Sequence, residues 1–284
     1  MRTLALSLAL AAWLPCAAGA AWWAENDYVT GSNGEKRDSA TAFARIDKNF
    51  MAGASAAFYR NTAGYREKVY AFRAPLMYSG ARHFLSLTPF VYPVTPGTRS
   101  GAKGARAYLQ TSMTEPDDEN YLNLTVAGAL ASQDAMRADL GRRKSFSESS
   151  VELQAEKSFF GQFYLLGSAA AFGKSGGATN GNLAAPALDH SEMAYLGTFT
   201  QLTALPDWVM TFQASRSMKP DFDSHLYLGY SRISLRQAPR LASTVLGMKL
   251  ELNAKTTLDL AYNAVKAENA AYKNYYRVLL RLVF

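Results

Sequence analysis

Three histidines are the first side chains in this sequence that could carry out acid–base chemistry. His225 follows Asp223 by two positions, and residues two apart on a β-strand share a face. A carboxylate beside an imidazole orients it as a general base, as in many hydrolases. The neighbours of His190, Asp189 and Ser191, would instead point to the opposite face of a strand. Asp223 and His225 are therefore the candidate catalytic residues, and a purely structural His–carboxylate pair is the alternative.

The Asp-x-His spacing at Asp223 and His225 resembles the dyad of omptin proteases, which implies a peptide hydrolase. Omptins also use a second acidic pair, and the adjacent Asp117 and Asp118 would diverge on a strand. The acidic loop 114–120 offers oxygen ligands but lacks the glycine of a calcium loop. No zinc or phosphate-binding motif occurs. We therefore expect no metal and no cofactor, and we favour a function that is not enzymatic.

Apolar and polar residues alternate along most of the chain, and a period of two indicates β-strands. In 243–253, for example, the even positions from Thr244 to Leu252 share one face and the odd positions share the other. Many of these segments span about ten to twelve residues, the length that lets a tilted strand cross a bilayer. A soluble β-sandwich would also alternate, but it would not usually contain so many long strands. The expected strands are 40–46, 50–60, 64–74, 82–92, 104–113, 119–131, 146–159, 162–173, 190–203, 207–216, 223–235, 242–252, 255–265 and 273–284.

Charged residues on the polar faces of these segments are candidates to line a pore. One strand carries an acidic stripe, and the last three strands carry a mixed, mostly basic patch. Opposed rows of charge inside a barrel would create a transverse field that favours polar solutes. The alternative is that these side chains pair with one another and fill the interior. The expected pore-lining residues are Glu148, Glu152, Glu156, Lys249, Glu251, Asp259, Lys273, Arg277 and Arg281.

The N-terminus has the features of a secretory signal peptide. A single positive charge at Arg2 precedes an apolar run, Pro15 interrupts that run, and Ala18-Gly19-Ala20 fits a signal-peptidase site. We expect residues 1–20 to be removed. The only cysteine, Cys16, lies in this segment, so the mature chain would contain no disulfide. The net charge of +7 is scattered without a basic block, which argues against binding to nucleic acid.

The leader, the serial amphipathic strands and the terminal Phe284 together resemble a Gram-negative outer-membrane β-barrel. The resemblance implies an all-β, transmembrane, antiparallel up-and-down barrel of about 12 to 14 strands. It also implies the outer membrane as location, with lipid and lipopolysaccharide as surroundings. Residues 21–38 would form a periplasmic N-terminal segment and residues 39–284 the barrel. The expected signal to the barrel-assembly machinery is Tyr276, Val278, Leu280, Leu282 and Phe284.

From these features we expect a porin-like channel for passive passage of small polar or charged solutes. An outer-membrane hydrolase of lipid or peptide, using Asp223 and His225 at the rim, is one alternative. Counting strands back from a periplasmic C-terminus places the long connections 132–145 and 174–189 on the periplasmic side, where barrels normally have short turns. A structural or export-associated barrel that works with a periplasmic partner would account for them, and is the other alternative.

Overall fold

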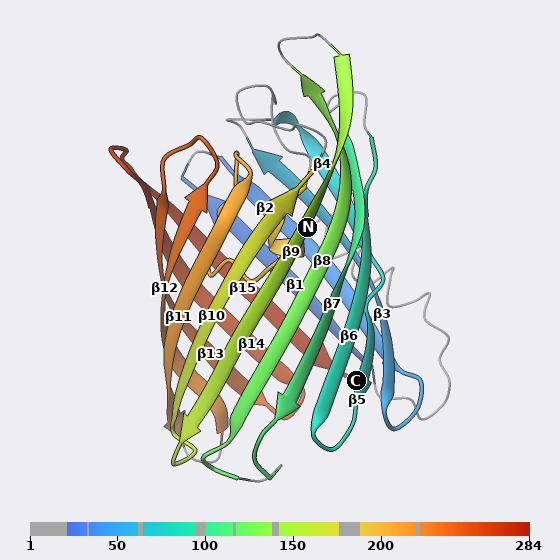
Figure 1. Cartoon of the computed structure of the whole chain (residues 1–284). Coiled ribbons are helices and arrows are strands. Elements are labelled where there is room, and N and C mark those ends of the chain that lie inside the picture. Colours follow the sequence, from blue (N-terminus) through green and yellow to red (C-terminus); the bar gives the residue numbers. More distant parts are fainter. Residues whose placement is uncertain are drawn as a thin grey trace.

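The computed structural model describes residues 22–32, 34–61, 65–94, 100–115, 118–137, 142–175, 188–219 and 222–284 (Figure 1). The predicted leader, 1–20, lies outside these ranges, as do the side chains of 61, 65–68, 135–137, 142, 143, 219, 222 and 223. The strands are β1 (Trp22–Gly31), β2 (Lys36–Arg45), β3 (Phe50–Asn61), β4 (Tyr65–Arg73), β5 (Leu76–Ser79), β6 (His83–Tyr92), β7 (Gly101–Ser112), β8 (Leu122–Arg137), β9 (Arg142–Phe159), β10 (Phe163–Lys174), β11 (Pro206–Lys219), β12 (Phe222–Leu235), β13 (Leu241–Asn253), β14 (Thr256–Ala267) and β15 (Tyr272–Val283).

These strands form one antiparallel sheet that closes on itself, because β1 pairs with β2 on one side and with β15 on the other. β4 and β5 lie end to end, since both pair with β3 and with β6, so the 15 strands occupy fourteen positions around the ring. Pro75, which has no N–H to donate, lies in the break between them. The predicted fold class, an up-and-down barrel, is confirmed.

The outer surface of the barrel is apolar and its inner surface is polar or small. On β12, Leu226, Leu228 and Tyr230 are each about half exposed, whereas Ser231 is 0% exposed. The alternation follows from strand geometry, which turns successive side chains to opposite faces. An apolar exterior suits contact with lipid chains, so the exposed hydrophobic residues indicate a membrane barrel. Among the described residues, no helix has both the length and the hydropathy needed to cross a bilayer.

The two ends of the barrel carry connections of different length. Consecutive connections alternate between the ends, and both β1 and β15 have their terminal residues, Trp22 and Val283, at the end we call the short-turn end. The connection between β10 and β11, residues 175–205, is at the other end, which we call the long-loop end. The turns at the short-turn end include 46–49, 80–82, 113–121, 160–162 and 254–255.

The predicted strand list adds one false strand and omits β1 and the short β5, and its count of fourteen still equals the number of positions in the ring because β4 and β5 share one position. Residues 190–203 are not a strand: they lie inside the barrel and include a 3₁₀ turn, η2 (His190–Glu192). Residues 22–31, expected in a periplasmic segment, form β1 of the barrel wall, and residues 36–38 are the first three of β2. Because of the false strand, the prediction places the connections that precede residue 190 at the wrong end of the barrel. The long connection 175–205 is in fact opposite to both termini, and most of 132–145 extends the hairpin of β8 and β9.

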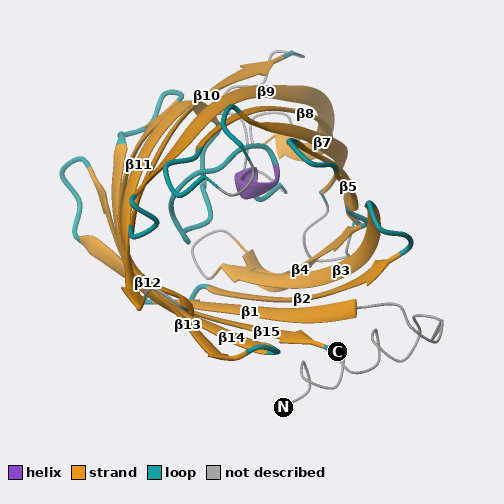
Figure 2. Ribbon diagram, turned by 90° about the horizontal axis from the view of Figure 1, so that it is seen from below, coloured by secondary structure: helices purple, strands orange, loops and turns teal. Residues whose placement is uncertain are grey.

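The described part of the long connection, residues 188–205, runs inside the ring of strands, and we call it the lumenal segment. Seen along the barrel, η2 and the loop after it lie within the lumen (Figure 2). Two clusters of buried hydrophobic residues join this segment to the inner wall, one around Met193 and one around Leu196 and Leu202. The interior of the barrel is therefore partly filled by its own chain.

Candidate functional site in the barrel lumen

The lumenal segment begins with a capped turn. Asp189 precedes η2, and its carboxylate accepts a hydrogen bond from the N–H of Ser191 at 3.0 Å. Aspartate is favoured at this position because it satisfies a donor that the turn leaves free. The same carboxylate lies 3.7 Å from the guanidinium of Arg37 on β2. The cap thus also ties the start of the segment to the wall.

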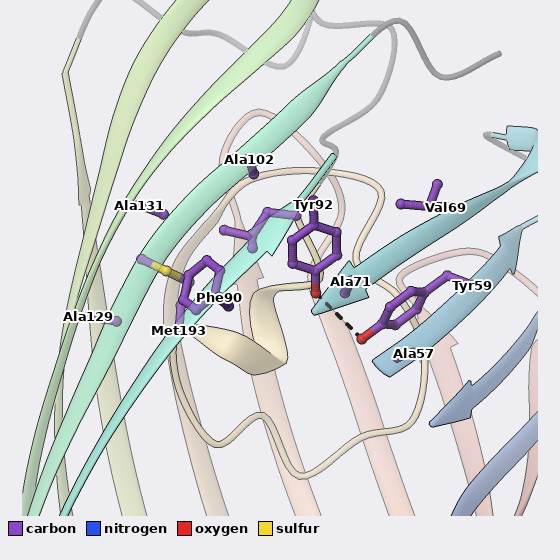
Figure 3. Close-up of a cluster of buried hydrophobic side chains, with 11 residues drawn as sticks. Ala57, Tyr59, Val69, Ala71, Phe90, Tyr92, Ala102, Ala129, Ala131 and Met193 are labelled. Carbon is purple, nitrogen blue, oxygen red and sulfur yellow. Dashed lines mark hydrogen bonds between the residues drawn. The ribbon is translucent and has the colours of Figure 1, made fainter. Parts of the chain in front are cut away.

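A buried ion pair holds the end of η2. Glu192 pairs with Arg73 of β4, and the hydroxyl of Tyr92 donates to the same carboxylate at 3.1 Å. Arg73 also donates to the hydroxyl of Tyr59, and Figure 3 shows the rings of Tyr59 and Tyr92 pointing toward one another. The Glu192 side chain is only 9% exposed, so removing its cation would leave a buried charge without compensation.

A second polar contact fixes His190 against β9. Its Nε2 lies 3.3 Å from the carboxylate of Glu148, and the amide of Gln133 donates to that carboxylate at 2.6 Å. The side chain of His190 is completely buried, with Phe172 at its edge. The sequence argues against a catalytic triad of His190 with Asp189 and Ser191, because adjacent residues on a strand point to opposite faces. In the structure His190 is a buried anchor of the lumenal segment.

Packing supplements these polar contacts. Met193 is 0% exposed and lies against Phe90 and the alanines of the inner wall (Figure 3). Its carbonyl oxygen accepts a hydrogen bond of 2.6 Å from Ser150 of β9. Small residues at Ala129 and Ala131 provide the space into which the segment fits. The small residues on the polar faces of the strands therefore have a packing role in this region.

The far half of the segment is held by a hydrogen-bonded cluster on β12, β13 and β14. The carbonyl oxygen of Gly197 accepts from Ser231 at 3.1 Å and from Ser243 at 3.2 Å. Asn263 accepts from the N–H of Phe199 at 2.9 Å and donates to Ser243 at 2.7 Å. Gly197 has φ +57°, and a Cβ there would lie 2.0 Å from the Ser231 hydroxyl oxygen. Glycine is required for both reasons.

A cavity of about 470 Å³ remains beside the lumenal segment. Its charged lining is arranged in pairs. Arg277 lies 2.9 Å from Asp27 and 3.4 Å from Asp259, and Arg37 lies 3.2 Å from Asp27. The guanidinium of Arg277 also lies over the ring of Phe199, 5.6 Å from its centroid. This chamber is strongly polar, but its charges are largely balanced.

A second cavity, of about 460 Å³, lies toward the short-turn end, and we call it the lower cavity. Gln213 and His225 line both cavities, so the two are neighbours along the lumen. The charged lining of the second cavity consists of one carboxylate, Glu156, and one ammonium group, Lys249. The hydroxyl of Tyr121 donates to Glu156 at 2.5 Å. Together the cavities form a polar space between the lumenal segment and the short-turn end.

The predicted acidic stripe and basic patch lie on opposite walls of the ring, on β9 and on β13 to β15. Each glutamate of the stripe has a nearby partner: Glu148 contacts His190, Glu152 accepts from Arg106 at 2.6 Å, and Glu156 accepts from Tyr121. The cation beside Glu152 weakens the expected transverse field at that point, because neighbouring opposite charges largely cancel at a distance. A role for these residues in lining a pore stays a prediction.

The basic patch on the opposite wall follows the same rule of local pairing. Lys273 lies 3.5 Å from Glu35, at the long-loop end. Arg281 lies 2.6 Å from Glu25, near the short-turn end. Glu251 is also near the short-turn end, where its N–H donates to Ser224 at 2.9 Å. The patch is therefore distributed along the height of the barrel rather than gathered at one level.

The candidate catalytic pair is at the short-turn end, because β12 begins there. His225 lines both cavities, and Asp223 is part of β12 although its side chain lies outside the described residues. The hydrolase hypothesis placed these two residues at a rim of the barrel, and the rim in question is the one at the short-turn end; a catalytic role for them stays a prediction. Within the described ranges, no group of three or more His, Cys, Asp or Glu side chains is arranged to hold a metal ion.

The C-terminal strand closes the ring beside β1. Tyr276 and Val278 are exposed on the outer face, and Phe284 stacks on Trp22 with ring centroids 3.8 Å apart. The N–H of Phe284 also donates to the carbonyl oxygen of Trp22 at 2.9 Å. Leu280 and Leu282 are partly buried on the same strand. Recognition of this strand by the assembly machinery stays a prediction.

Sequence reasoning missed the lumenal segment and the arginines that hold it. The signal for the segment was the run of four polar residues 189–192, which is unusual for a strand with one face in lipid. Asp189 followed by Glu192 also has the spacing of a capping box. The arginines gave no such signal, because an isolated Arg37, Arg73 or Arg106 on a polar face fits any strand of the barrel.

No family model matches the sequence, and no curated protein matches it. Solved structures do match. CdiB from Acinetobacter baumannii is 11% identical with a TM-score of 0.53, and the match covers 93% of this chain and 60% of that one. A TodX mutant, described as a monoaromatic hydrocarbon channel, is 12% identical with a TM-score of 0.51 over 93% and 89%. OmpT, an outer membrane protein of Vibrio cholerae, is 8% identical with a TM-score of 0.50 over 93% and 97%. The chain resembles outer-membrane β-barrels. At these identities the likeness concerns the fold.

Proposed function

We propose that this protein is a channel for passive passage of small polar solutes across the outer membrane. The observation that carries the proposal is the pair of neighbouring polar cavities, of about 470 and 460 Å³, inside a closed barrel with an apolar exterior. A ring of fourteen strands is too wide for side chains of the wall to fill alone. The lumenal segment narrows this ring, and polar groups line what remains.

The lumenal segment supplies the constriction of the channel. It contacts β4 through Glu192, β9 through His190 and β14 through Phe199, so it crosses the lumen from wall to wall. Passing solutes would meet paired charges rather than a net field. We therefore expect weak ion selectivity, with the size of the solute as the main criterion.

The short-turn end faces the periplasm in this proposal, because outer-membrane barrels have short periplasmic turns and longer extracellular loops. Both ends of the barrel sequence, Trp22 and Phe284, are then periplasmic. The strands that flank the lumenal segment, β10 and β11, meet it at the outer end of the barrel in this orientation. With the long connection on this side, the argument that long periplasmic connections require a partner no longer applies.

The test is single-channel recording with the refolded protein in planar lipid bilayers. We expect stable conductance steps, and a shift toward cation selectivity when Lys249, which lines the lower cavity, is changed in Lys249→Gln. Lys48→Gln is the matched control, since Lys48 is an exposed residue in a turn at the short-turn end. Folding is checked by circular dichroism. A folded barrel that inserts but conducts no ions would overturn the proposal.

A further inference from the structure

Aromatic rings follow the inner wall at the short-turn end in an unbroken series. Tyr121, Tyr164, His225 and Tyr227 are neighbours in this order, and each step between ring centroids is 6.3 Å. They come from parts of the chain far apart in the sequence: Tyr121 directly precedes β8, Tyr164 is near the beginning of β10, and the other two are in the first half of β12. We call these four residues the aromatic track. Strand geometry alone places His225 beside Tyr227 on β12, whereas the other two steps join rings from different hairpins.

The track is presented to the lumen rather than buried in the wall. Tyr121, Tyr164 and His225 are partly exposed and line the lower cavity, and His225 and Tyr227 line the chamber beside the lumenal segment. Tyr227 packs in turn against Phe199 of that segment. A solute moving between the short-turn end and the constriction would therefore pass along a continuous aromatic surface.

Polar groups of both kinds flank the rings. Glu156 accepts from Tyr121, Asp259 accepts from the hydroxyl of Tyr227 at 2.7 Å, and Gln213 lines both cavities. The lower cavity contains one carboxylate and one ammonium group among its described lining residues, so it offers donors and acceptors without a strong net charge. The track thus combines flat aromatic faces with hydrogen-bonding groups at the edges of the rings.

We propose that the aromatic track is a binding site for linear oligosaccharides. A sugar ring has a C–H face that stacks on an aromatic ring and hydroxyl groups at its edge that both donate and accept hydrogen bonds. A hydrocarbon would displace water from Glu156, Gln213 and Lys249 without offering hydrogen bonds in return, at a cost in desolvation. A strongly charged ligand would find no excess of opposite charge. Successive rings at one spacing fit a chain of repeating units. The inference deepens the proposed channel function by naming its solute class.

The test is isothermal titration calorimetry of the refolded full-length barrel in a detergent that contains no sugar headgroup. The probes are maltohexaose, cellohexaose and a polyethylene glycol of similar length, which lacks hydroxyl edges. We expect saturable binding of at least one hexasaccharide and none of the glycol. Tyr164→Leu and His225→Leu should each weaken binding about tenfold, the value of one aromatic stacking contact. Tyr164→Phe should retain it, because the ring remains.

Tyr230→Leu is the matched control, since Tyr230 is on β12 beside the track but faces outward and is 49% exposed. Circular dichroism confirms that each variant is folded. Failure of both sugars to bind, equal binding of the glycol, or unchanged affinity in both leucine variants would overturn the proposal. Bilayer conductance of the same preparation separates the two proposals: conductance without sugar binding overturns only the track, and binding without conductance overturns only the channel.

Discussion

Gly197 gives the sharpest test of the lumenal segment as a constriction. Gly197→Ala places a methyl group 2.0 Å from the Ser231 hydroxyl oxygen and 2.6 Å from a Thr211 methyl carbon. The φ of +57° adds strain of about 1–2 kcal/mol for a residue with a side chain. Loss of the two serine hydrogen bonds to the Gly197 carbonyl adds about 1 kcal/mol each. The sum is about 3 to 4 kcal/mol against the anchored position.

A change of this size raises the population of the displaced segment by about two to three orders of magnitude. The barrel wall itself should remain intact, because its strand pairing does not involve Gly197. We therefore expect higher mean conductance and larger open-channel noise than in the wild type, measured in planar bilayers. The effect should be visible at neutral pH and moderate salt, since it depends on a steric contact.

Gly167→Ala is the control for this experiment. Gly167 is on β10, faces outward, and has no atom within 4 Å of the position a Cβ would occupy. The Gly167→Ala variant should have the same conductance as the wild type. If Gly197→Ala folds normally and shows wild-type conductance and noise, the reasoning is refuted, because the segment would then not limit passage.

Two further predictions concern stability. Arg73→Ala should lower the free energy of unfolding by about 3–5 kcal/mol in urea titrations in detergent, because it leaves Glu192 buried and unpaired. The control is Arg82→Ala, which breaks an exposed ion pair and should lower the free energy of unfolding by less than about 1 kcal/mol. Equal losses in the two variants would contradict the argument. Phe284→Ala should slow refolding into lipid vesicles and lower the free energy of unfolding by about 1 kcal/mol, because the ring stack on Trp22 is lost. A variant that refolds at the wild-type rate and has wild-type stability would show that the ring contact is dispensable.

The sequence was sufficient for the barrel because the relevant information is local. Side chains on a strand alternate by covalent geometry, so residues such as Leu226 and Ser231 indicate which face meets lipid without knowledge of the partner strand. The inward direction of Glu152, Asp259 and Arg277 followed from the same alternation. The charge partners of these residues could not be inferred in this way, since they come from other strands.

The first strand was missed for a related reason. Residues 22–31 contain polar residues at Glu25, Asn26 and Asp27, and they are only weakly amphipathic. They form a strand because β2 and β15 would otherwise leave two edges of the sheet unpaired. The pairing of β1 with β15 joins residues from opposite ends of the chain. The alternation of polar and apolar residues within a ten-residue segment therefore cannot predict it.

The sequence by itself thus determined the class of fold, the apolar exterior and the polar lumen, because these depend on a period of two and on the bilayer as solvent. The tertiary structure decided which end carries the long loop, and it placed residues 188–205 inside the ring. It also brought Tyr121, Tyr164 and His225 together in one series. These features depend on contacts between hairpins far apart in the chain. Such contacts exist only in the closed barrel, where side chains from distant hairpins become neighbours across the lumen.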